Sequence, residues 1–191
     1  SNDALTALSV IYPMQLVIIA LAVGTGVGVN TYMARKYAQE RPKDAEAAAG
    51  CGTVLALVSW ALFAALSLIF MRPYVKTGAT SPEAVEYAVI YGNIVCAGSI
   101  GVFLEGNWTK VHQARGNMRR PMIAQITGAL TNIILDPILI FGIGPAPEMG
   151  VAGAAAATVI GQICAAVIVS VGAVCKPPEL KHMRRFINRI Y

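Results

Sequence analysis

Five long stretches of the sequence are almost free of charge, and no other feature limits so strongly what the chain can fold into. A helix needs about 20 mostly apolar residues to cross a bilayer. We place the spans near residues 8–31, 47–71, 84–108, 120–143 and 149–175, and the first, second and fifth contain no Asp, Glu, Lys or Arg. Only helices and closed barrels satisfy their backbone polar groups in hydrocarbon, and these stretches are too long for barrel strands. The sequence therefore predicts an all-α membrane protein, a polytopic bundle of about five transmembrane helices.

The composition argues against a water-soluble enzyme. Only 13% of the 191 residues are charged, whereas a soluble domain has roughly 25%. The four cysteines show no paired spacing with each other or with histidine, so no metal centre or disulfide framework is indicated. No nucleophile–base pair is visible either. We predict no enzyme, no cofactor and no structural metal.

The basic residues set the expected orientation. All but two of the 15 Lys and Arg residues lie in three regions: between the first and second spans, between the third and fourth, and after the fifth. Short loops rich in Lys and Arg stay in the cytoplasm. We therefore expect a multi-pass protein of the plasma (inner) membrane, with the N-terminus outside and the C-terminus cytoplasmic. This placement explains the net charge of +5 without a nucleic-acid partner.

Residues 1–176 are predicted to form the transmembrane bundle, and residues 177–191 an amphipathic linker helix on the cytoplasmic surface. In this last segment apolar residues recur at helical spacing, with Lys and Arg on the opposite side. Small residues recur at helix-packing spacing within the bundle. They are the pair Gly24 and Gly28, and the series Gly153, Ala157 and Gly161.

Three sequence blocks carry a family pattern: HQARGN at residues 112–117, GALTNIILDPILIFG at 128–142 and GVAGAAAATVIGQ at 150–162. In order and spacing they resemble the multidrug and toxic compound extrusion (MATE) family of cation-coupled efflux transporters. The resemblance implies a twelve-helix protein of two six-helix lobes. This chain resembles helices two to six of the N-terminal lobe, with the start of the linker between the lobes. The expected partners are then the missing first helix and C-terminal lobe of the same protein, besides the lipid bilayer.

Asp136 is the clearest candidate for a functional residue. An acidic residue within a membrane span costs several kcal/mol unless it is paired or hydrated, so it is a functional candidate by default. Asn132 lies one turn earlier on the same helix face. Pro137 cannot donate a backbone hydrogen bond, so we expect the helix to bend beside the carboxylate. Thr158, on the next helix, falls at a similar depth, and the three side chains are predicted to converge.

Carboxylate, amide and hydroxyl oxygens in one place can bind a sodium ion, and the carboxylate alone can take up a proton. By resemblance, Asn132, Asp136 and Thr158 match a cation- or proton-coupling site of the N-terminal lobe. Gln162 and Glu105 are candidates for lining the same cavity. Purely structural roles stay open: a helix cap or interhelical pairing for Asp136 and Asn132, a backbone-bonded hydroxyl for Thr158, and a snorkelling or salt-bridged Glu105.

The leading hypothesis is a secondary active multidrug efflux transporter, an antiporter driven by H⁺ or Na⁺, that exports small organic and often cationic compounds by alternating access. One alternative is a lipid-linked oligosaccharide flippase of the same superfamily. Such a flippase is expected to line its cavity with cations for a pyrophosphate, and no Lys or Arg lies in the core of any span. The other alternative is a non-transporting membrane scaffold subunit, which has no need for Asp136 beside Pro137.

Overall fold

The computed structural model describes residues 2–144 and 147–174, without the side chains of residues 172–174. The linker helix predicted for residues 177–191 lies outside the described residues. Within them the chain is helical and contains no strand. The helices are α1 (Asn2–Ala38), α2 (Pro42–Gly78), α3 (Pro82–Gly98), α4 (Ile100–Ala114), α5 (Arg119–Phe141) and α6 (Val151–Val174).

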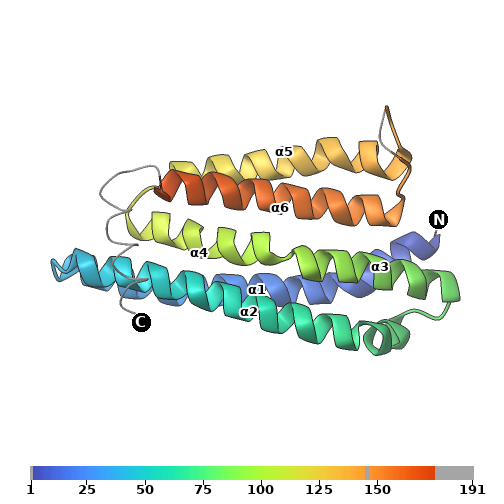
Figure 1. Ribbon diagram of the computed structural model, residues 1–191, viewed down its shortest axis with the longest axis horizontal. Coiled ribbons are helices and arrows are strands. Elements are labelled where there is room, and N and C mark those ends of the chain that lie inside the picture. Colours follow the sequence, from blue (N-terminus) through green and yellow to red (C-terminus); the bar gives the residue numbers. More distant parts are fainter. Residues whose placement is uncertain (1, 145–146, 175–191) are drawn as a thin grey trace.

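The helices lie side by side as an elongated bundle, and in the described part of the chain they form five segments long and apolar enough to cross a membrane. Figure 1 shows α1 and α2 on one side, α5 and α6 on the other, and α3 and α4 between them. The prediction of an all-α bundle of about five transmembrane helices is confirmed.

The first two helices are much longer than the predicted spans near 8–31 and 47–71. Each has 37 residues, a length of about 55 Å at 1.5 Å per residue. The hydrocarbon core of a bilayer is only about 30 Å thick. The ends of α1 and α2 therefore extend beyond the apolar layer, where they carry the charged residues that delimit the apolar stretches.

The third span consists of two helices separated at Ser99, a break that the sequence analysis did not predict. The hydroxyl of Ser99 is buried and donates to the carbonyl oxygen of Cys96 at 2.7 Å. Gly98 and Gly101, on either side of Ser99, allow this region to pack closely on α6. A Cβ added at Gly101 would lie 2.9 Å from the backbone carbonyl carbon of Gln162. The break thus lies where α3 and α4 meet α6.

The surface of the bundle is apolar. Large side chains point outward, such as Ile69 at 68% exposed, Leu62 at 62% and Phe70 at 59%. Alanine is frequent among the buried residues, alongside a few larger side chains such as Phe103 and Met71. A chain that buries small residues and exposes large aliphatic ones suits lipid as its solvent, because packing between helices then depends on close approach of backbones.

The contact of α5 with α6 is made through glycine. A Cβ added at Gly161 would lie 2.7 Å from the carbonyl oxygen of Gly128, and one added at Gly128 would lie 2.8 Å from the carbonyl oxygen of Gly161. The packing predicted for Gly161 is confirmed. Gly24 and Gly28 differ, since a Cβ added at either meets nothing within 4 Å in the described part of the chain.

The connections divide the bundle into two ends. The α1–α2 and α4–α5 connections lie at one end, and the α2–α3 and α5–α6 connections at the other, together with the N-terminus (Figure 1). We call the first of these the basic end, because basic residues lie in or next to both of its connections: Arg35, Lys36, Arg41 and Lys43 at the first, and Arg115, Arg119 and Arg120 at the second. The last turn of α6 lies at this same end (Figure 1).

Candidate functional site

A cleft of about 280 Å³ lies among α4, α5 and α6. It exists because α5 packs closely along α6, and α6 along α4, while α4 and α5 hardly touch. Five of its lining residues are polar, namely Glu105, Gln125, Asn132, Thr158 and Gln162, and the others are Gly, Ala or Val. Small residues on α5 and α6 leave the space that larger side chains would fill.

The end of the cleft farther from the basic end contains Asn132. Its amide nitrogen lies 3.5 Å from Oδ1 of Asp136 and 3.5 Å from Oγ1 of Thr158. Both contacts are long for hydrogen bonds. The hydroxyl of Thr158 instead donates to the carbonyl oxygen of Ala154 at 2.9 Å. Thr158 is therefore back-bonded to its own helix, and its oxygen, which has only the long contact with Asn132, can still accept from a ligand.

Helix α5 delivers Asn132 and Asp136 from one face, four residues apart. The helix is not interrupted at Pro137 and ends at Phe141. It is capped by Gly142, whose φ of 66° is the left-handed conformation common after a helix end. Backbone N–H groups of Gly142 and Ile143 both donate to the carbonyl oxygen of Ile138. This cap fixes the last turn of α5, one turn beyond Asp136.

The other end of the cleft, nearer the basic end, contains Glu105 on α4. Its Oε1 accepts a hydrogen bond from Oγ1 of Thr109 at 2.8 Å and a long one from Nε2 of Gln125 at 3.5 Å. Gln125 comes from α5, so this contact spans the narrow gap between α4 and α5. Within the described residues no cation pairs with Glu105, so the expected alternative of a salt bridge is not supported there.

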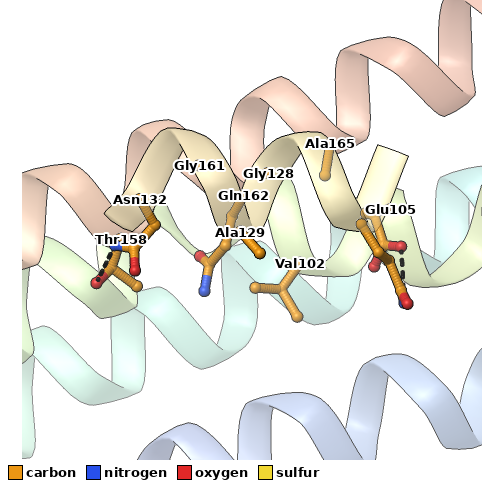
Figure 2. Close-up of a pocket in the computed structure, with 10 residues that line it drawn as sticks. Val102, Glu105, Gly128, Ala129, Asn132, Thr158, Gly161, Gln162 and Ala165 are labelled. Carbon is orange, nitrogen blue, oxygen red and sulfur yellow. Dashed lines mark hydrogen bonds between the residues drawn. The ribbon is translucent and has the colours of Figure 1, made fainter. Parts of the chain in front are cut away.

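Gln162 lies between the two ends, on α6. Figure 2 shows its side chain between the Asn132–Thr158 contact on one side and Glu105 on the other. The Oε1 atom of Gln162 is buried and has no hydrogen-bond partner within the described residues. A buried carbonyl oxygen without a donor is unusual, and this oxygen is an acceptor that a molecule in the cleft could use.

The structure therefore brings the predicted residues Asn132, Asp136 and Thr158 together, and places Gln162 and Glu105 along the same cleft. Asp136 adjoins the cleft through Asn132 and is not among its lining residues. The sequence analysis missed Gln125. The signal that could have found it is the spacing of seven residues to Asn132, which places both on one face of α5 two turns apart.

The matches to known proteins fit this geometry. A family model described as MatE matches residues 1–138. The chain belongs to the MatE family. Members of this family are membrane transporters and not enzymes.

Two curated relatives illustrate the range of the family. The MatE chain is 32% identical over 167 residues to a FAD transporter of Shewanella oneidensis, covering 86% of this chain and 36% of the relative. It is 29% identical to a probable multidrug resistance protein NorM of Thermotoga maritima, covering 84% of this chain and 34% of the relative. The chain thus spans about a third of the length of the curated relatives that it matches.

Solved structures agree on the fold. An inward-facing conformation of a multidrug resistance MATE family transporter is 26% identical, with a TM-score of 0.85 over 96% of this chain and 44% of that one. An outward-facing conformation is 25% identical, also with a TM-score of 0.85, over 97% of this chain and 44% of that one. The MatE chain fits both conformations equally well.

Proposed function

We propose that this chain is part of a secondary active efflux transporter of the plasma membrane, in which uptake of H⁺ or Na⁺ at Asp136, Asn132 and Thr158 drives export of small organic compounds. The observation that carries the proposal is the position of the Asn132 amide, 3.5 Å from both the Asp136 carboxylate and the Thr158 hydroxyl. These oxygens come from two helices, lie within membrane spans and hold one another only loosely. Such a cluster can bind a cation without first breaking strong internal bonds.

Alternating access is the mechanism that suits the fold. Equal similarity to inward-facing and outward-facing relatives favours a unit that moves as a body against the rest of a transporter. Cation binding at Asp136 would change the charge beside the end of α5 and so favour one of the two positions. The basic end would face the cytoplasm, as positively charged short loops do, with the N-terminus of the chain outside.

The cleft favours cationic or uncharged cargo over anionic cargo. Among its lining residues in the described part of the chain there is an acidic side chain, Glu105, and no Lys, Arg or His. A pyrophosphate-linked lipid, or a dinucleotide like that named for the S. oneidensis relative, would require cationic partners. A flippase and a flavin dinucleotide exporter are therefore less well supported for this part of the protein than an exporter of organic cations.

The experiment that tests the proposal reconstitutes a full-length family member carrying this segment in liposomes. Efflux of a fluorescent organic cation is followed under an imposed pH gradient, an imposed Na⁺ gradient, or neither. We expect efflux to accelerate at least about tenfold with one of the two gradients. Efflux that is the same with and without both gradients would contradict the coupling.

Replacing Thr158 by valine should tell the two coupling ions apart. Valine keeps the shape of threonine and removes an oxygen that could bind sodium, whereas protonation of a carboxylate needs no hydroxyl ligand. If Na⁺ is the coupling ion, we expect the sodium concentration for half-maximal efflux to rise about tenfold. If H⁺ is the coupling ion, the rate under a pH gradient should change less than about twofold.

Thr131→Val is the matched control. Thr131 lies on the neighbouring helix α5 and, like Thr158, donates its hydroxyl to the carbonyl oxygen four residues earlier, here that of Thr127. It should leave the dependence on either ion unchanged. A large effect of Thr158→Val under a pH gradient alone would show that the hydroxyl has a structural role.

A further inference from the structure

The cleft has two polar ends, and the proposed coupling cluster accounts for only one of them. Gln125 lines one end of the cleft, and Asp136 adjoins the other end through Asn132. The two residues are eleven positions apart on α5, which corresponds to about 16 Å along the helix. Glu105 lies beside Gln125. The two carboxylates are thus far enough apart to hold different ligands at the same time.

The Glu105 end of the cleft has acceptor oxygens that are not fully used within the described residues. Both donors that reach the carboxylate, from Thr109 and Gln125, go to Oε1. The second oxygen, Oε2, has no hydrogen bond to another described residue. Farther along the cleft, Oε1 of Gln162 is buried and accepts no hydrogen bond from the part of the chain that the structure describes. A ligand that donates hydrogen bonds suits these acceptors, and a protonated amine is such a ligand.

Charge points in the same direction. A carboxylate within a membrane span is costly unless a cation or water compensates it. The two neutral donors on Oε1 leave the negative charge of Glu105 in place, and no Lys, Arg or His lines the cleft within the described residues. A positively charged ligand supplies the missing compensation.

The remaining walls of the cleft are suited to the body of such a ligand. Val102, Ala129 and Ala165 are apolar, and Gly128 leaves the surface of α5 flat. Apolar walls with a few placed polar groups are typical of sites for small organic molecules. Figure 2 shows this stretch between the Gln162 side chain and Glu105.

We infer that Glu105 is a specificity-determining residue that binds the charged nitrogen of organic cations, with Gln162 as a second acceptor, separately from the ion that is taken up near Asp136. This inference rests on the proposed transport function and assigns its substrate class to a particular carboxylate. In this scheme Glu105 determines which cargo binds. The ion that binds near Asp136, at the other end of the cleft, drives the conformational change.

The test is equilibrium binding to the purified full-length family member in lipid nanodiscs, without any ion gradient. The probes are ethidium, an aromatic cation whose positive charge is shared by resonance with two amino groups that donate hydrogen bonds, and Nile red, an uncharged aromatic dye. Glu105→Gln keeps the shape and the acceptor oxygen for Thr109 while removing the charge. We expect it to weaken ethidium binding about tenfold, the effect of losing one charge-assisted contact, and to change Nile red binding less than about twofold.

Two further variants test whether a loss of ethidium binding is due to the charge at this position and not to general damage to the protein. Glu105→Asp retains the charge and should bind ethidium within about threefold of the wild type. Glu83→Gln removes a charge from the exposed first turn of α3, outside the cleft, and should leave the affinity for both dyes unchanged.

Equal weakening of both dyes by Glu105→Gln would overturn the inference, because it would show that the residue only maintains the shape of the cleft. Unchanged ethidium binding would overturn it as well. Either result can be read independently of the coupling proposal, since no gradient is present. The coupling proposal can also fail by itself. If wild-type efflux does not respond to either gradient but Glu105→Gln selectively weakens ethidium binding, the cation site is supported and only the coupling proposal is contradicted.

Discussion

Gly161→Leu is expected to prevent stable assembly of the bundle. At Gly161 the backbones of α5 and α6 approach so closely that even a Cβ would lie 2.7 Å from the carbonyl oxygen of Gly128. The obstacle is backbone, which cannot rotate away as a side chain could. Because α5 packs mainly against α6, separating them removes most of what holds α5 in the bundle. Overpacking in a well-packed interior costs about 1–3 kcal/mol and occasionally more, and a clash with backbone belongs at the upper end of this range.

The measurement is the thermal stability of the detergent-solubilised full-length protein, read as the fraction that remains monodisperse after heating. The Gly161→Leu protein should be lost well below the midpoint of the wild type, and its yield should fall severely. Gly24→Leu is the matched control, since an added Cβ there meets nothing within 4 Å in the described part of the chain. A Gly161→Leu protein as stable as the Gly24→Leu protein would show that the α5–α6 contact is looser than described.

This contrast between glycines shows what sequence patterns can and cannot predict. Gly24 and Gly28 have the small-xxx-small spacing, as do Gly153, Ala157 and Gly161. Only the second series contacts another described helix closely. The spacing predicts that a face is smooth enough to be approached, but the identity of the neighbour depends on the arrangement of all helices and cannot be read from one of them.

The spans themselves were predictable because a long charge-free stretch has few alternatives in a membrane protein. The break at Ser99 was not predictable in the same way. Gly98 and Ser99 lie inside an apolar stretch that reads as continuous, and the break depends on where α6 packs against it. Local composition therefore located the helices, whereas a tertiary contact determined where one of them is divided.

In the candidate site, too, contacts within one helix were predictable from the sequence, whereas a contact between two helices was not. Asn132 and Asp136 were predictable as a pair because they are four residues apart on one helix, and Thr158 followed from matching depths on adjacent helices. Gln125 and its contact with Glu105 required the structure, since the pairing joins α4 to α5 across a gap that depends on both packing against α6. Pairs within a helix follow from periodicity, and pairs between helices follow only from their placement.

Asp136→Asn is expected to abolish gradient-driven efflux if the proposed coupling is right. Asparagine has nearly the same size as aspartate. In the native protein Oδ1 of Asp136 lies 3.5 Å from the Asn132 amide nitrogen, and the side-chain oxygen of an asparagine can keep this contact. It cannot take up a proton at the relevant pH, and it carries no negative charge to balance sodium. The change thus removes the ability to bind the driving ion while disturbing the packing little.

We expect efflux of a fluorescent cation from proteoliposomes to fall at least about 100-fold, to the level seen without a gradient, while ethidium still binds in nanodiscs within about threefold of the wild type. Asp3→Asn provides the control, because Asp3 lies in the first turn of α1, away from the cleft, where its carboxylate accepts a hydrogen bond from Ser81. That variant should pump normally. Ethidium binding can persist without pumping only if the cargo and the driving ion bind at different places. If Asp136→Asn removes both ethidium binding and efflux, the cargo and the ion share one site.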